Sequence, residues 1–355
     1  MLSRDLLVFQ RPLLNFARST NERMIVVSAC AAAAIIQSAF FDGGHSLIVA
    51  AAALAAALLV EIAVCWPRAG LRLMDASAVV TALVLTLILP NMIHPALAAA
   101  GAAFAIGVVK HCFGGLGANW FNPALGGWLF IRFSWPSAFS KALQSSPLAF
   151  ISAWMEENQG AGGASPVTIL GKNGFGTQNG GAITQFLNDT VFSLFHIEMP
   201  AAYVDFFIDP GAALIADRGL FALLAGSVIM TAAMAGRSML SALYIAALLL
   251  FTRLGGALPF GGPAWGGDML FAVFSGATLA AAFFIVIDPG TSPKSPVCRI
   301  SLALFAAFLT FYFRYVKAEA CGALFAAAAV NSIAPLVSMA EEKLFYERSF
   351  IGRHT

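Results

Sequence analysis

The chain of 355 residues is strongly apolar, with 59% hydrophobic residues, 11% charged residues and a mean hydropathy of +0.82. About a quarter of the residues of an ordinary soluble domain carry charge, so this composition excludes a soluble globular protein and requires lipid around the fold. The formal net charge of +2 gives no reason to expect a nucleic-acid partner.

Apolar runs of roughly 16–22 residues recur along almost the whole chain, and each is close to the length that crosses a hydrocarbon layer about 30 Å thick. An arginine-containing polar segment precedes the first run and no small-residue cleavage site follows it, so we expect this first helix to be retained. The pattern predicts an all-α polytopic membrane protein with about ten transmembrane helices, at residues 24–41, 46–66, 76–90, 95–112, 120–135, 219–236, 238–253, 267–287, 299–316 and 320–338.

A long polar stretch in the middle of the chain separates five predicted helices from five. Halves with an odd number of spans have opposite topologies, which is the arrangement of inverted repeats in many transport folds. A cytoplasmic N-terminus would place lysine and arginine residues at five separate span ends on the cytoplasmic side, together with the C-terminus. The expected organisation is an N-terminal cytoplasmic segment (1–23), a first five-helix half (24–135), an extracytoplasmic loop (136–218), a second half (219–338) and a cytoplasmic tail (339–355).

Within the expected outer loop, glycine is concentrated between residues 159 and 181. Such density favours backbone bends, or the close approach of another group, over regular structure. Short helical segments are expected on either side, at about 146–156 and 182–196. A flexible linker is the alternative interpretation of this loop.

Two polar breaks interrupt the apolar pattern, one in each half. Between residues 113 and 124, glycines and a proline accompany Asn119 and Asn122, which we expect to cap a helix start and to present amide groups to a ligand. A tight turn between helices with ordinary capping is the alternative. The second break spans residues 287–296, where Asp288 is placed to cap the next turn. Each break contains an Asn-Pro or Asp-Pro pair at a similar place in its half, as a site between inverted repeats would require.

A carboxylate and an ammonium group in the predicted spans are candidates for function. Glu61 lies about one turn from the end of the second span, and Lys110 lies near the cytoplasmic end of the fourth. Intramembrane ionisable groups are costly and are therefore candidates for function. Alternatively, Lys110 extends to the membrane interface and serves no chemical role.

Two other chemistries are not expected from this chain. The five cysteines are scattered, without a CxxC motif or a Cys/His cluster, so the sequence predicts neither an iron–sulfur nor a zinc site. Residues 275–278 read Ser-Gly-Ala-Thr, which is similar to part of a flavin-attachment motif. The segment lies inside an apolar run, however, where small residues more often serve close helix packing.

Several segments together resemble the NqrB/RnfD family of membrane proteins from the sodium-pumping NADH:quinone reductase and the Rnf complex. The most specific is the string Lys-x-x-Phe-Gly-Gly-Leu-Gly-x-Asn-x-Phe-Asn-Pro-Ala, which begins at Lys110. The resemblance covers most of the chain and is carried by Ser19-Thr20 and by residues 75–90, 104–124, 275–291 and 331–336.

This resemblance implies a ten-helix inverted-repeat bundle that passes electrons between flavins as one component of a redox-driven pump for Na⁺ or H⁺. Length favours the Rnf-type protein. The implied partners are other integral membrane subunits, flavin and iron–sulfur subunits, a flavin transferase and membrane lipid. The implied location is the bacterial inner membrane.

The family attaches FMN to the threonine of a Ser-x-Ala-Thr-Pro-Leu-like motif in the loop between the halves. The matching positions here read Gly162-Gly-Ala-Ser-Pro-Val, so Ser165 stands where the threonine is expected and offers the same hydroxyl group. Thr168 is a second candidate acceptor. A second, noncovalent flavin (riboflavin) is also considered, with Asn119, Asn122, Lys110 and Asp288 as candidate cofactor-binding residues.

Two other functions remain open. A channel or transporter for a small polar solute fits the five-plus-five layout and the paired breaks in the helices. A flavin-free scaffold within a redox complex fits the loss of the motif's threonine.

Overall fold

The computed structural model describes residues 20–65, 76–115, 117, 119–139, 180–195, 207, 214–233, 235–255, 269–286, 295–317 and 319–351. The predicted outer loop (136–218) is therefore described only in part, chiefly by α9 (Gly180–Thr190) and the short η4 (Phe192–Phe195), with α11 (Ile215–Arg218) at its end. Within the described residues the chain is helical apart from turns and one isolated β-bridge, between Pro90 and Leu214. The expected all-α architecture is confirmed.

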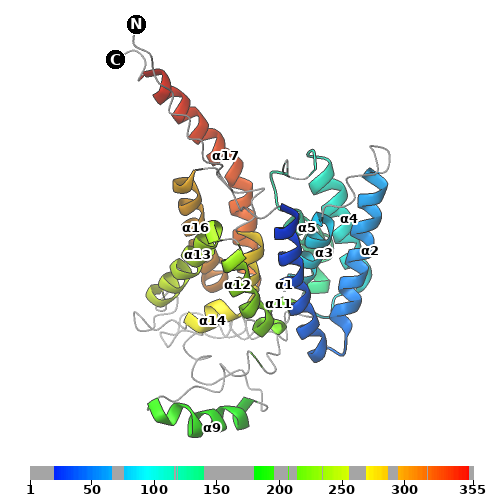
Figure 1. Cartoon of the computed structure of the whole chain (residues 1–355), viewed down its shortest axis with the longest axis vertical. Helices are drawn as coiled ribbons and strands as arrows, with labels where there is room; N and C mark the ends of the chain where they lie inside the picture. The colour runs from blue at the N-terminus through cyan, green and yellow to red at the C-terminus, as the bar shows by residue number, and fades with distance from the viewer. Residues whose placement is uncertain are drawn as a thin grey trace, which may run out of the picture.

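The first half packs as five helical passes (Figure 1). Proline at the first helical position begins α4 and α5, where its missing N–H costs nothing. The elements are α1 (Thr20–Phe41), α2 (His45–Cys65), α3 (Ser77–Leu87), α4 (Pro95–Phe104), continued by the π-helical turn η3 (Ala105–His111), and α5 (Pro123–Ser134).

The second half forms five further passes among the described residues, one of which is broken into short pieces. The last helix continues well beyond the expected end of its span at residue 338 and extends out of the bundle (Figure 1). The elements are α11 (Ile215–Arg218), α12 (Leu220–Ala233), α13 (Ala235–Leu254), α14 (Met269–Phe274), α15 (Thr278–Ala280), η6 (Ala281–Ile285), α16 (Pro296–Phe311), η7 (Tyr312–Val316) and α17 (Gly322–Ile351).

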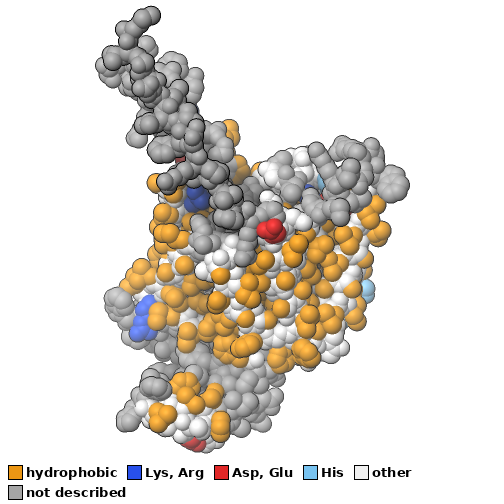
Figure 2. All heavy atoms as spheres, viewed as in Figure 1, with side chains coloured by type: hydrophobic (Ala, Val, Ile, Leu, Met, Phe, Trp, Pro, Cys, Tyr) orange, Lys and Arg blue, Asp and Glu red, His pale blue; other side chains and the backbone are white. Residues whose placement is uncertain are grey.

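The outer surface of the bundle is suited to lipid. Four helical segments of the described chain are long and apolar enough to cross a membrane, at Thr20–Phe41, His45–Cys65, Pro296–Val316 and Gly322–Glu341, and shorter apolar helices lie between them. Hydrophobic side chains spread across the middle of the face shown in Figure 2, where charged side chains are sparse. Phe40 is 81% exposed and Phe133 is 72% exposed, which is costly in water and favourable in a bilayer.

The first helices of the two halves run in opposite directions. The sulfur of Cys30 in α1 approaches the carbonyl of Gly226 in α12, whereas Gln37, further along α1, accepts a hydrogen bond from the N–H of Ala222, which comes earlier in α12 (2.6 Å). Later positions of one helix therefore meet earlier positions of the other. This antiparallel pairing is what two halves of opposite topology require.

Small residues allow α4 and α5 to cross closely. A Cβ atom built on Gly127 would lie 2.6 Å from the carbonyl oxygen of Gly101. Gly127→Ala is therefore expected to force the helices apart and to lower the free energy of unfolding by about 1–3 kcal/mol. Thermal unfolding in detergent checks this. Gly107→Ala is the control, because its Cβ would make only an ordinary contact of 3.4 Å with Val60; an equal loss in both variants would contradict the close crossing.

Candidate functional site: two buried charge clusters

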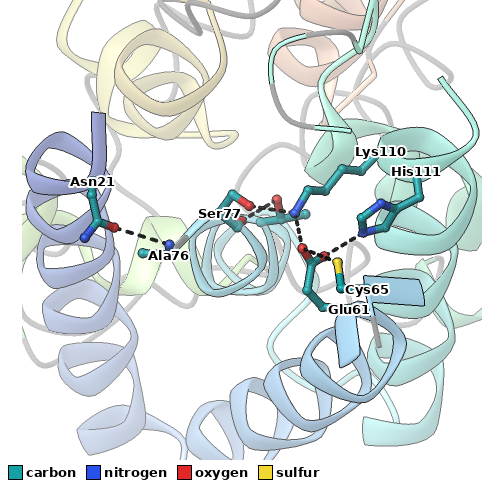
Figure 3. Close-up of polar contacts among 8 residues, drawn as sticks. Asn21, Glu61, Cys65, Ala76, Ser77, Lys110 and His111 are labelled. Atoms are coloured by element: carbon teal, nitrogen blue, oxygen red, sulfur yellow. Dashed lines mark hydrogen bonds and ion pairs between the residues drawn. The ribbon is translucent and has the colours of Figure 1, made fainter. Parts of the chain in front are cut away.

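A buried ion pair joins the end of α2 to the end of the fourth pass (Figure 3). Lys110 donates hydrogen bonds to Glu61 Oε1 at 2.7 Å and to Ser77 Oγ at 2.6 Å. Lys110 is 2% exposed and Glu61 is 4% exposed. The lysine therefore does not extend to the membrane interface; it neutralises a carboxylate inside the bundle, where each charge alone would be expensive.

Two further side chains complete this cluster, which we call the Glu61 cluster (Glu61, Cys65, Ser77, Lys110 and His111). His111 Nε2 lies 2.8 Å from Glu61 Oε2, and Cys65 Sγ donates to Glu61 Oε1 at 3.8 Å. Figure 3 shows these groups converging from α2, α3 and η3.

Local structure explains why these residues meet. Glu61 and Cys65 are four residues apart, so both project from one face of the last turns of α2. Lys110 and His111 are neighbours in sequence at the end of the π-helical turn η3, and both reach the same carboxylate. π-Helical turns are rare and occur frequently at functional sites.

The eighth pass is broken, which corrects the prediction of one continuous helix over 267–287. α14 ends at Phe274 and α15 begins at Thr278. Between them Gly276 and Ala277 adopt the left-handed region, with φ of +66° and +55°. Ala277 is the one non-glycine residue with positive φ among the described residues, and such a conformation persists only where surrounding contacts hold it.

Arg314 in η7 provides those contacts on one side of the break. Its Nη1 donates to the carbonyl of Ala272 at 2.5 Å and to Thr278 Oγ1 at 2.8 Å, and its Nη2 donates to Ser275 Oγ at 2.5 Å. Arg314 is only 1% exposed. One guanidinium thus binds the end of α14, the loop and the start of α15.

Asp217 in α11 provides the contacts on the other side. Its two carboxylate oxygens accept the backbone N–H groups of Gly276 (2.9 Å) and Ala277 (2.8 Å), and its charge interacts favourably with Arg314. We call Asp217, Ser275, Thr278 and Arg314 the Arg314 cluster. Asp217 and Arg314 thus form hydrogen bonds with backbone N–H and C=O groups that the break would otherwise leave unpaired.

The two clusters lie at opposite ends of the bundle. Ser77 of the Glu61 cluster begins α3, whereas the N–H of Ile215, two residues before Asp217, donates to the carbonyl of Leu89 beyond the end of α3 (3.1 Å). The 11 residues of α3 span about 16 Å. The two clusters also share one feature. In each half, a buried cation at the end of that half's fourth pass bonds to a serine of its third pass: Lys110 in η3 to Ser77, and Arg314 in η7 to Ser275.

The asparagines of the first break behave differently from each other. Asn122 caps α5, because its side-chain oxygen accepts the N–H of Leu125 at 3.2 Å, which confirms the predicted cap. Asn119 is 8% exposed, and its side-chain oxygen has no hydrogen-bond partner among the described residues. Neither asparagine joins the Glu61 cluster. Ser165, Thr168 and Asp288 lie outside the described residues.

Five participants were not singled out as site residues from the sequence: Cys65, Ser77, His111, Asp217 and Arg314. The available signal for Arg314 was an arginine inside the predicted span 299–316, since such a charge must find a partner. Cys65 and His111 lie 46 positions apart, so no local spacing rule for metal ligands applies to them.

Most of this chain is similar in sequence to known proteins. The NQR2, RnfD, RnfE family matches residues 7–346. A protein of Shewanella loihica, named as the D subunit of an ion-translocating oxidoreductase complex, is 30% identical over 297 residues, covering 78% of this chain and 79% of its own. Proteins of the same name from Shewanella amazonensis (29% identical; 75% of each chain) and Methanosarcina acetivorans (26% identical; 76% of this chain and 72% of its own) are also similar. The chain belongs to the NQR2, RnfD, RnfE family.

Proposed function

We propose that this chain is the RnfD-like membrane component of an ion-translocating oxidoreductase complex, in which it passes electrons through bound flavin and couples their flow to Na⁺ or H⁺ movement. The observation that carries the proposal is the family match over residues 7–346, together with the name that similar proteins carry. The bundle of ten helical passes among the described residues, with buried charges at both ends, supports it. The chain would act within the complex and not alone.

The residues around the first break fit a flavin. Asn119 offers a buried acceptor that lacks a partner among the described residues, which suits a ring N–H group. Beside it, Trp120 makes edge contacts with Phe113 and Phe121, with ring centroids 5.8 Å apart in both pairs, so the break provides aromatic surface next to this acceptor. Asn119 and this aromatic group would hold a noncovalent flavin. A bound flavin would supply the capacity to accept and release electrons.

Covalent FMN on the outer loop is the second part of the proposal, with the hydroxyl of Ser165 as the preferred acceptor and that of Thr168 as the second. Attachment would require a flavin transferase on the outer side. Flavin and iron–sulfur subunits and further membrane subunits are the proposed partners. The proposed location is the bacterial inner membrane, with both termini in the cytoplasm, as the distribution of lysine and arginine favours.

Each charge cluster has a defined part in this proposal. The Glu61 cluster would lie toward the cytoplasm and the Arg314 cluster toward the outside, so that charged and hydrogen-bonding groups face both ends of the bundle. Groups of this kind inside a membrane commonly mark ion or proton paths. The protein's task around the flavins would be to fix their positions and to exclude water.

The covalent part is tested by in-gel flavin fluorescence of the denatured chain after expression with a flavin transferase. Fluorescence is expected in the native chain and in Thr168→Ala, and its loss is expected in Ser165→Ala, because a phosphoester bond requires the hydroxyl. Loss in Thr168→Ala alone would move the attachment to Thr168. A dark band in the native chain would refute covalent attachment.

A transporter for a small polar solute is the second candidate function, favoured by the break of the eighth pass within opposed halves, which is a feature of secondary transporters. Solute flux into vesicles containing the flavin-free chain would support it. A chain without flavin and without flux would leave a scaffold role in the complex.

A further inference from the structure

Part of the Glu61 cluster has the chemistry of a transition-metal site. The carboxylate of Glu61, the thiol of Cys65 and the imidazole of His111 each offer one ligand atom, and these three atoms lie within 4.8 Å of one another. Two ligands come from consecutive turns of α2 and one from η3. Oxygen, sulfur and nitrogen donors of this kind bind Zn²⁺ in proteins.

The observed spacing requires only a small adjustment. Donors held about 2.0–2.3 Å from a tetrahedral ion are about 3–4 Å from one another. His111 Nε2 lies 2.8 Å from Glu61 Oε2, and Cys65 Sγ lies 3.8 Å from the other oxygen, Oε1, so an ion bound through Oε2 requires His111 to move slightly away from the carboxylate and Cys65 to turn toward Oε2. Cys65 and His111 are both partly exposed, so the side chains that must adjust lie at the accessible edge of the cluster.

Lys110 and Ser77 would orient the metal-binding carboxylate. Lys110 holds Glu61 Oε1 at 2.7 Å, and Ser77 in turn accepts from Lys110 at 2.6 Å, so the other carboxylate oxygen is directed toward His111. Hydrogen bonds of this kind to a ligating carboxylate fix its orientation and raise metal affinity. The lysine also balances the carboxylate charge, so the ion and the thiolate add a net charge of about +1 to a neutral cluster.

We propose that Glu61, Cys65 and His111 bind a borderline divalent transition-metal ion of the Zn²⁺ class, with one coordination position left open. Binding forms a metal–sulfur bond, and the thiol proton of Cys65 leaves to the solvent. Thiolate and imidazole ligands disfavour Na⁺, Mg²⁺ and Ca²⁺, so the metal bound here would not be the ion that the complex would pump. The proposal of a metal site does not depend on the proposed flavin chemistry.

Cobalt spectroscopy of the full-length, chelator-treated chain in detergent provides the test. Co²⁺ is expected to produce an absorption band from thiolate-to-metal charge transfer, and Zn²⁺ is expected to abolish that band by displacement. Cys65→Ser should remove the band. His111→Ala should weaken binding at least about tenfold, because it deletes a ligand.

Cys112→Ser is the matched control. Cys112 follows His111 directly, but its thiol is exposed and donates to the carbonyl of Gly107 at 3.4 Å, outside the proposed ligand set. This variant should retain the full band. Thermal unfolding measured in parallel identifies any variant that fails to fold. If Cys65→Ser is such a variant, the metal affinity of His111→Ala provides the independent test. The absence of a charge-transfer band in the native chain, or its persistence in Cys65→Ser, would overturn the proposal.

Discussion

Arg314→Met is expected to lower the free energy of unfolding by about 3–5 kcal/mol, because the buried carbonyl and hydroxyl groups that the guanidinium binds lose their donor. The substitution keeps much of the side-chain volume but removes all three hydrogen bonds to the broken eighth pass. Asp217, which is partly buried, would then lose its favourable interaction with the guanidinium charge. The loss is measured as a decrease in thermal stability of the purified chain in detergent and as a lower yield of folded protein.

Two neighbouring variants separate the causes of this loss. Arg314→Lys keeps the charge but not the planar fork that reaches several acceptors at once, so an intermediate stability is expected. Lys317→Met removes an exposed cation from the same stretch of chain and should change little. Native-like stability of Arg314→Met would contradict the account of the broken helix.

Glu61→Leu and Lys110→Met should each be strongly destabilising, again by about 3–5 kcal/mol, since each leaves its partner charged in an apolar setting. The double variant removes both charges and should lose much less than the sum of the single losses. Thermal unfolding of the four proteins measures this coupling. Strictly additive losses would show that the 2.7 Å contact contributes no coupling energy.

The double variant also separates structure from function. If the pair belongs to the ion path, a chain that folds without it should still assemble and bind flavin, while ion transport driven by electron flow falls. Retained transport in the double variant would assign the pair a structural role only. The comparison requires the whole complex in vesicles, with electron transfer and ion uptake measured on the same preparation.

Much of the fold could be predicted from the sequence because the bilayer imposes a length on each apolar run. The Asn-Pro pair at residues 122–123 also indicated where α5 begins, and the structure has the helix start at Pro123 with Asn122 as its cap. The break at residues 275–277 was missed for a physical reason. Ser-Gly-Ala-Thr is compatible with a packed helix, and the break depends on Asp217 and Arg314, which are distant in sequence.

The candidate site was predictable only in its individual members. Glu61 and Lys110 were identifiable because charge within a membrane is costly, but nothing local to either residue shows that they pair across 49 positions. The same holds for His111, which joins the cluster through the π-helical turn η3. Such turns depend on tertiary packing, and no residue pattern in the sequence predicts them.

Flavin content and reducibility of the chain, purified without denaturation from cells that also produce the other subunits and a flavin transferase, test the central proposal most directly. The account predicts a yellow protein that contains stoichiometric flavin, covalent or extractable, whose absorption is bleached by reductant and restored by oxidation. A folded, colourless chain that yields no flavin on extraction would contradict an electron-carrying role.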